Sequence, residues 1–422
     1  MNWLFNKLEI GEELKKNFFV IMLVSAGGAI IYMLPYFRYD YYDAYMNMYN
    51  LSNTQIGVFG SIFGVFGFIS YLFGGYVADR FSIRKIIAIS LVGTGLGGFV
   101  HLMDLSFPAL VALYAFWGFS SLFAFWPACI KAVRVLSDAD GQGKAYGIFE
   151  GGRGIFAALT ASSAVIVFKL GANKLGEAYG IKQLMFFYAV ITTLCGILVF
   201  LFMKDETIRD DEHISFKDIK NVIKLPAVWI IAIVTFCNYV YTLSSFYFTP
   251  YSTTILGVSV AFGATLAASK RWIAPFSNVG GGYLGDKFGT SNLLLASFVI
   301  MIIGVVGILA LPLNPSTTIT IMYTVLFIIS YLAYQVNSTI TWAMMEEGAV
   351  PEKYSGTAAG LISTIGYLPD VFISILAGAT LDAFPGVTGF RYFFGFLIAM
   401  LTLGTLAVMM WKRLLKKQKL AQ

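Results

Sequence analysis

The chain has 422 residues, of which 58% are hydrophobic and only 12% are charged, and its mean hydropathy is +0.75. Soluble domains carry about 25% charged residues, so this chain lacks the polar groups that a soluble surface of its size requires. The composition therefore excludes an ordinary soluble enzyme and predicts a membrane protein whose surface faces lipid.

Twelve apolar segments follow one another along the chain, each near the roughly 20 residues that a spanning helix needs. One long polar stretch, Lys204–Lys224, interrupts them and predicts a linker with an amphipathic part on the membrane surface. We expect an all-α membrane protein with an N-terminal six-helix half at 1–203, a cytoplasmic linker at 204–224, and a C-terminal six-helix half with a basic tail at 225–422. The twelve helices are predicted near 17–41, 54–78, 85–104, 107–133, 145–169, 181–203, 226–251, 260–284, 291–312, 318–343, 355–381 and 391–411.

The distribution of basic residues predicts that both termini lie in the cytoplasm. With that orientation, 21 of the 29 lysines and arginines fall in inside loops and tails, and four fall in outside loops. Cytoplasmic loops carry such an excess of positive charge. The asymmetry accounts for the net charge of +6 without any nucleic-acid partner.

The two halves repeat a short motif. The segment GYVADRF at 75–81 follows the second predicted helix, and GYLGDKF at 282–288 follows the eighth, 207 residues later. A second echo joins the glycine pair at 143 and 147 to the pair at 356 and 360. Duplicated halves around a site at the membrane midplane are typical of transporters.

The first copy of this motif, with the charges that follow it, resembles the cytoplasmic loop motif of the major facilitator superfamily. Ser82 stands where that family usually has glycine. In the functional interpretation, the aspartate faces a helix N-terminus in the other half and the arginines reach carboxylates, which holds the cytoplasmic side closed. The alternative is ordinary positive charge on an inside loop. The predicted loop residues are Gly75, Asp79, Arg80 and Arg84, with Gly282, Asp286 and Lys287 in the second copy.

Ionisable residues inside predicted helices indicate function because they are costly in a membrane. Arg153 lies about 14 Å along the fifth helix at 1.5 Å per residue, and Glu150 precedes it by one turn on the same face. Arg271 lies roughly 22 Å from the cytoplasmic boundary by the same rise, and we expect the adjacent Lys270 to point elsewhere. Several cations around a cavity would bind an anion, and arginine suits oxyanions through its forked donors. The alternatives are a structural pair for Arg153 and snorkelling to the interface for Lys131. The candidate substrate-binding residues are Arg38, Lys131, Glu150, Arg153, Arg271 and Tyr367.

Several segments resemble the organophosphate:phosphate antiporter branch of the same superfamily. These are FWPACIK at 125–131, SGTAAG at 355–360 and GYL at 366–368. The resemblance implies that Arg38 corresponds to a first-helix arginine that binds the substrate anion, and that Arg153 falls where those carriers have a cavity histidine. Their second binding arginine aligns with Thr242, a departure that leaves phosphate exchange open and for which Arg271 can compensate. The chain is more similar still to YihN-type carriers, through GGAIIYMLP at 27–35, FEGGRGI at 149–155 and GYLP at 366–369.

The sequence therefore predicts a secondary carrier of a small organic anion that works by alternating access in the inner membrane. One alternative is a proton-coupled transporter of a neutral sugar or a drug exporter, with Asp40, Glu150 and Asp370 as the carboxylates that would titrate. A membrane enzyme or sensor is disfavoured because no paired catalytic residues or phosphate-binding loop occur in the cytoplasmic segments. We expect no catalytic residues, cofactor or metal. The expected partners are the substrate, a co- or counter-transported ion and the lipid bilayer, and we expect a monomer.

Overall fold

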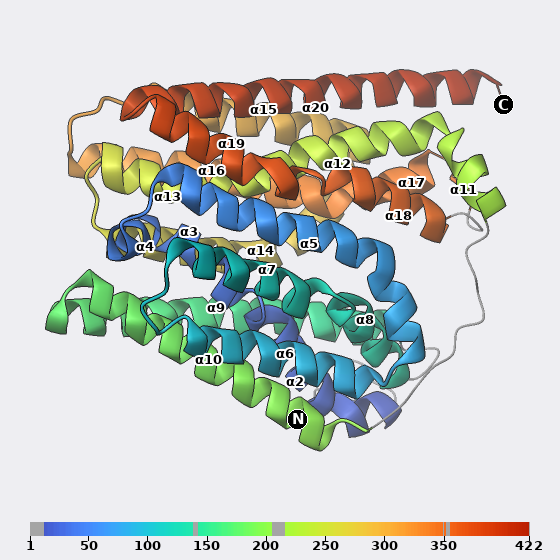
Figure 1. Ribbon diagram of the computed structural model, residues 1–422. Coiled ribbons are helices and arrows are strands. Elements are labelled where there is room, and N and C mark those ends of the chain that lie inside the picture. Colours follow the sequence, from blue (N-terminus) through green and yellow to red (C-terminus); the bar gives the residue numbers. More distant parts are fainter. Residues whose placement is uncertain (1–11, 138–141, 205–215, 349, 352–354, 422) are drawn as a thin grey trace. The chain divides into compact units, whose positions relative to one another are not determined.

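The computed structural model describes residues 12–137, 142–204, 216–348, 350–351 and 355–421, and every regular element in these ranges is a helix. The chain divides into two compact units (Figure 1). Unit 1 comprises Met1–Asn50 and Ile62–Asp211, and unit 2 comprises Leu51–Ser61 and Glu212–Gln422. Much of the predicted linker, 205–215, falls outside the described residues. Its amphipathic part is helix α11 (Phe216–Ile223).

Unit 1 holds the first six predicted spanning segments, apart from the start of the second one at 54–61, which belongs to unit 2. Helices α6 and α10 lie side by side in it, and α9 packs on both α10 and α2 (Figure 1). Helix α5 begins in unit 2 and continues into unit 1. The helices are α2 (Glu12–Ile30), α3 (Met33–Asp40), α4 (Tyr42–Tyr49), α5 (Asn53–Arg80), α6 (Ile83–Val100), α7 (Phe107–Leu122), α8 (Phe125–Val135), α9 (Gln142–Leu175) and α10 (Glu177–Phe202).

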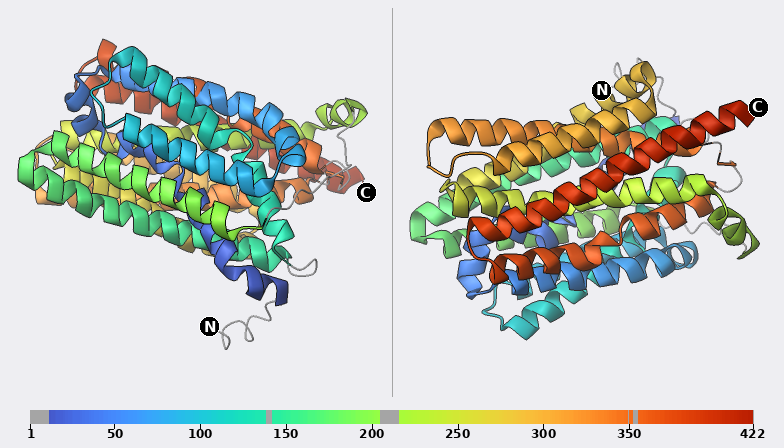
Figure 2. Two further views of the ribbon diagram at one scale, coloured as in Figure 1. Left: turned by 60° about the horizontal axis from the view of Figure 1, so that its bottom comes forward. Right: turned by 90° about the horizontal axis from the view of Figure 1, so that it is seen from above.

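Unit 2 holds the other six segments. Figure 2 shows α20 as one uninterrupted helix that runs to the C-terminus, and it packs on α12 and α15. After α11 the helices are α12 (Pro226–Ser244), η2 (Ser245–Tyr247), α13 (Phe248–Pro250), η3 (Tyr251–Ile255), α14 (Val260–Phe288), α15 (Thr290–Leu309), α16 (Thr317–Ile340), η4 (Thr341–Ala343), α17 (Met344–Glu347), α18 (Ser355–Gly366), α19 (Pro369–Ala383) and α20 (Val387–Ala421).

Prolines break three of the predicted spans. A proline ring clashes with the carbonyl four residues earlier and cannot donate the helical hydrogen bond. Accordingly, α2 and α3 meet at a bend of 44° just before Pro35, α7 and α8 separate at Phe123–Ala124 before Pro127, and α18 and α19 separate before Pro369. Ala124 takes a left-handed backbone conformation with φ of 57° at its break.

Ten helices are long and apolar enough to cross a membrane, or 11 if the bent pair α2–α3 is one span, among the residues that the structure describes. Helix α14 has 29 residues, the length of a span, but is less apolar because it carries Lys270 and Arg271 near its middle. It occupies the place of the eighth predicted helix. The predicted all-α fold is confirmed.

Close helix packing within each unit depends on glycine. In unit 1, a Cβ on Gly98 would lie 2.8 Å from the Cβ of Ala189, and one on Gly196 would lie 2.8 Å from the Cβ of Leu91. Small residues let membrane helices approach in this way, because lipid supplies little hydrophobic driving force between them. The α6–α10 pair is therefore a rigid support for the neighbouring helices α2 and α9.

Candidate functional site

The predicted pair on the fifth spanning segment forms as expected. On α9, Nη1 of Arg153 donates to both carboxylate oxygens of Glu150, at 2.8 and 2.6 Å. The Arg153 side chain is 25% exposed and the Glu150 side chain is 53% exposed. The arginine therefore lies against the protein, whereas its carboxylate partner remains accessible. A half-exposed ion pair of this kind can be opened by a competing anion at moderate cost.

Two neighbouring helices fix the position of the Arg153 guanidinium. Its centre lies 4.4 Å from the ring centroid of Trp126 on α8, and its Nε donates to the backbone oxygen of Gly28 on α2 at 3.4 Å. A Cβ on Gly28 would lie 3.2 Å from both Cδ and Nε of Arg153, so only glycine leaves normal room for the side chain. The sequence did not reveal these two supports. We call Gly28, Trp126, Glu150 and Arg153 the Arg153 site.

Arg38 lies in a different, fully buried environment of unit 1. Only 1% of its surface is exposed, and its guanidinium lies 4.1 Å from the ring centroid of Tyr39 and 4.6 Å from that of Tyr114. One of its nitrogens donates to the backbone oxygen of Pro35. Aromatic rings stabilise such a cation in a dry environment. The structure therefore encloses this predicted substrate-binding residue in an aromatic cage.

His101, which the sequence analysis did not select, lies next to this cage. Its Nε2 is 2.8 Å from the hydroxyl of Tyr45, and its ring stacks on Tyr49 with centroids 5.8 Å apart. His101 is fully buried and lies edge-on to the ring of Tyr114, the same ring that the guanidinium of Arg38 contacts. The histidine therefore belongs to the same buried aromatic cluster as Arg38.

Unit 2 contains a polar pocket with a carboxylate beside it. The hydroxyl of Tyr239 donates to Oδ2 of Asp370 at 2.8 Å, and the Tyr239 and Tyr367 rings meet with centroids 4.7 Å apart. The side-chain oxygen of Asn238 is buried and has no hydrogen-bond partner among the described residues. The pocket encloses about 30 Å³, room for little more than water, and is lined by Thr235, Asn238, Tyr239, Thr242, Tyr334, Ser338, Thr341, Trp342 and Tyr367.

The two neighbouring cations on α14 differ in how deeply they are buried. Lys270 is 5% exposed, and its Nζ lies 4.9 Å from the ring centroid of Phe246 and 5.9 Å from that of Tyr331. Arg271, the predicted binding residue, is half-buried. Arg271 was predicted to bind substrate because it could replace a missing arginine, but its neighbour Lys270 is buried more deeply. Lys270 is therefore the more enclosed cation of this pair.

The remaining predicted binding and proton-coupling residues are dispersed within the units. Lys131 is half-buried on α8, and Asp40 is buried at the end of α3. Tyr367 is half-buried at the break between α18 and α19. These residues stay predictions.

The loop-motif residues are described in part. Arg80 ends α5 and is exposed, and Gly282 is exposed on α14. The guanidinium of Arg84 lies 4.9 Å from the ring centroid of Phe200, and Nζ of Lys287 lies near the ring of its own neighbour. The structure describes only the helical backbone of Gly75, Asp79 and Asp286.

An all-helical chain with at least ten membrane-length helices, and with buried charges on the bent pair α2–α3 and on α14, has the properties of a membrane transporter. The sequence matches the Major Facilitator Superfamily over residues 17–373, and the chain belongs to that superfamily. It is a transporter rather than an enzyme, as predicted.

Relatives and solved structures agree with this assignment. The chain is 28% identical to inner membrane protein YqcE of Escherichia coli (strain K12), covering 93% of each chain. It is also 28% identical to inner membrane protein YihN of the same organism, covering 96% of this chain and 98% of YihN. A more distant relative is the probable nitrate/nitrite antiporter NarK1 of Thermus thermophilus, 26% identical over 63% of this chain and 60% of that protein.

Two solved transporters share the fold. A bacterial homologue of the human lysosomal transporter Spinster, inward-facing and unoccupied, matches with a TM-score of 0.74 at 15% identity, covering 96% of this chain and 98% of that one. The nucleoside transporter NupG matches with a TM-score of 0.71 at 12% identity, covering 94% and 98%. At these identities the likeness shows the fold alone.

Proposed function

We propose that this chain is a secondary active transporter that moves a small organic anion across the inner membrane by alternating access, with both termini in the cytoplasm. The proposed substrate is an organic phosphate, an organic sulfonate or an organic carboxylate. The observation that carries the proposal is the Arg153 site: a cation on a membrane helix, fixed by two neighbouring helices and neutralised by a carboxylate that is itself accessible.

The Arg153 site suits reversible binding of an oxyanion. When no substrate is present, Glu150 neutralises the guanidinium and lowers the cost of holding it within the membrane. An incoming oxyanion would take over the donors of Arg153 and release Glu150 toward solvent. Because Trp126 and Gly28 fix the plane of the guanidinium, its donors are oriented before the anion arrives. The antiporter name of the relative NarK1, which refers to nitrate and nitrite, also favours an anionic substrate.

Exchange in proteoliposomes tests the proposal. Purified protein is reconstituted in vesicles loaded in turn with an organic phosphate, an organic sulfonate and an organic carboxylate. We expect at least one unlabelled anion inside the vesicle to accelerate uptake of its labelled form, and Arg153→Gln to abolish that acceleration. If neutral sugars stimulate exchange and none of the anions does, anion transport is wrong.

A proton-coupled transporter of a neutral, hydroxylated substrate is the second candidate. The observation that favours it is Asp370, a carboxylate in a predicted membrane helix that accepts a hydrogen bond from Tyr239 beside the small, hydroxyl-rich pocket of unit 2. A carboxylate that takes up and releases a proton during the cycle would couple transport to the pH gradient. In that case Asp370→Asn would abolish accumulation driven by an imposed pH gradient but keep exchange at equal pH.

A further inference from the structure

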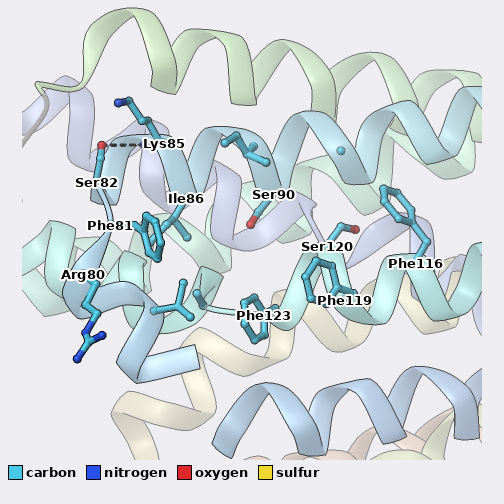
Figure 3. Close-up of a pocket in the computed structure, with 14 residues that line it drawn as sticks. Arg80, Phe81, Ser82, Lys85, Ile86, Ser90, Phe116, Phe119, Ser120 and Phe123 are labelled. Carbon is cyan, nitrogen blue, oxygen red and sulfur yellow. Dashed lines mark hydrogen bonds between the residues drawn. The ribbon is translucent and has the colours of Figure 1, made fainter. Parts of the chain in front are cut away.

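Unit 1 contains a large groove that the transport site does not use. It lies between the end of α5, the first half of α6 and the second half of α7, and has a volume of about 990 Å³. Figure 3 shows Arg80, Ser82 and Lys85 near one end, and Phe116 and Ser120 toward the other. We call it the α6–α7 groove. Its lining is Val77, Arg80, Phe81, Ser82, Lys85, Ile86, Ile89, Ser90, Gly93, Phe116, Phe119, Ser120, Phe123 and Ala124.

The length of the groove is apolar, with small residues between large ones. Ile89 is 69% exposed on α6, and Phe116 and Phe119 are 44% and 49% exposed on α7. Gly93 lies on α6 and faces α7, and a Cβ there would make only ordinary contacts, 3.7 Å from Phe116 and 3.9 Å from Ser120. Large side chains on both sides of small ones form a hollow rather than a flat helix face. A flexible hydrocarbon chain fits such a hollow.

One end of the groove is basic. Arg80 ends α5 and Lys85 lies in the first turn of α6, and both side chains are exposed. The backbone N–H of Lys85 donates to Oγ of Ser82 at 3.2 Å, which fixes the start of α6 and with it the position of the lysine. Among the described residues that line the groove, these two carry positive charge and none is acidic. This end attracts anions, and phosphate is a strong acceptor for both side chains.

The dimensions match one leaflet of a bilayer. Helix α6 begins at Ile83, the first residue of a candidate membrane span, and Gly93 lies ten residues later. At 1.5 Å per residue this is about 15 Å, half of the hydrocarbon core of about 30 Å. The groove thus extends from the membrane surface, where its basic end lies, to the midplane. The distribution of basic residues assigns that surface to the cytoplasm.

We propose that the α6–α7 groove binds an anionic phospholipid of the cytoplasmic leaflet, with its phosphate at Arg80 and Lys85 and one acyl chain along Ile89, Phe116 and Phe119. A soluble anion would use only the basic end and leave the apolar length without a function. A zwitterionic lipid would bring a positive group to the same two cations. The amphiphile that satisfies both parts carries net negative charge at its headgroup.

Native mass spectrometry of the intact protein tests this proposal. Protein is released from bilayers of equal parts phosphatidylglycerol and phosphatidylcholine, and the lipids and protein copies in each particle are counted. We expect the wild type to retain phosphatidylglycerol in preference to phosphatidylcholine. Lys85→Gln should reduce that retention about fivefold, the contribution of one basic residue beside an anionic headgroup, about 1 kcal/mol.

A second variant tests the apolar part. Gly93→Leu places a side chain into the groove and should remove the bound lipid to a similar extent, whereas Gly395→Leu should leave retention unchanged. Gly395 is likewise a helical glycine, but it is exposed on α20 in unit 2 and has nothing within 4 Å of an added Cβ. If Gly93→Leu does not fold, Ile89→Asn alters the same exposed wall without touching the interior.

Three results would overturn the proposal. Equal retention of the two lipids by the wild type would leave the basic end without a role. If the Gly93→Leu variant still retains phosphatidylglycerol, the lipid binds outside the groove. The same conclusion holds for Ile89→Asn where Gly93→Leu does not fold. A wild-type dimer that Gly93→Leu dissociates would show that a second copy of the chain, rather than a lipid, fills the groove.

Discussion

Replacing Arg153 by lysine keeps the positive charge but removes the planar fork, and we expect the affinity for an organic anion to fall strongly. In the structure Nη1 serves both oxygens of Glu150, Nε donates to Gly28, and the guanidinium lies 4.4 Å from the Trp126 ring centroid. A lysine has one nitrogen and no plane, so it cannot keep these contacts and also bind an oxyanion in two-pronged fashion. Loss of a charged hydrogen bond costs about 1.5–3 kcal/mol, which is about ten- to a hundredfold in affinity.

Calorimetric titration of the purified variant with the transported anion measures this change, in protein shown to be folded by its melting temperature. Lys182→Gln is the matched control, because it removes an exposed ion pair, 3.2 Å from Asp104, outside the site. We expect that control to bind as the wild type does. The reasoning is refuted if Arg153→Lys binds normally. It is also refuted if exchanging Arg153 and Glu150 restores affinity, since the pair would then serve structure alone.

Three further predictions test positioning, gating and topology. Gly28→Ala should displace Arg153 and weaken anion binding about tenfold while the charge stays intact. Gly151→Ala is the control, because nothing lies within 4 Å of its added Cβ, and it should bind as the wild type does. Equal affinities of the two variants would contradict the positioning role of Gly28. Asp79→Asn should abolish transport, while expression and ligand-induced thermal stabilisation persist. If the variant transports normally, the loop motif provides only the positive charge that is common on cytoplasmic loops. A reporter active only in the periplasm should work when fused at Asn314 and be silent within the linker, and the reverse pattern would invert the proposed orientation.

The helices were predictable because lipid imposes one requirement on every span. Each needs about 20 apolar residues, and each of the twelve segments corresponds to a helix or a broken helix. The three helices that are broken in the structure were predicted as continuous spans. Prolines at 35, 127 and 369 are visible in the sequence, but whether a proline bends a span slightly or divides it depends on the packing around it. Helix α4, a short helix of eight residues, has no hydropathy signal and was missed.

The candidate site was predictable only where its contacts are local. Arg153 and Glu150 lie three residues apart on one helix, so their ion pair follows from helix geometry. Trp126 and Gly28 contact the same guanidinium from α8 and α2, and no spacing along the chain indicates a contact over 125 residues. The cage around Arg38 also joins two segments, because Tyr39 lies on α3 and Tyr114 lies on α7. The position of a residue along its helix was predictable from the sequence. The direction in which its side chain points depends on how the helices pack.

Lys270 illustrates the same limit within a single helix. Two adjacent residues of an α-helix point about 100° apart, so Lys270 and Arg271 face different surroundings and one of them can be buried more deeply than the other. The sequence cannot decide which, because α14 has basic residues at both positions and apolar residues around them. The aromatic rings of Phe246 and Tyr331, from other parts of unit 2, decide it in favour of Lys270.

The two candidate transport mechanisms make opposite demands on the two units. Anion exchange requires Arg153 of unit 1 for binding and does not require Asp370 of unit 2 to titrate. Proton coupling requires Asp370 for accumulation, and Arg153 then matters only for its pairing with Glu150. Because these residues belong to different units, we expect their substitutions to act independently on the measured rates. An anion exchanger loses exchange with Arg153→Gln and keeps it with Asp370→Asn. A proton-coupled carrier of a neutral substrate keeps exchange in both variants and loses accumulation with Asp370→Asn, so the two measurements together decide the mechanism.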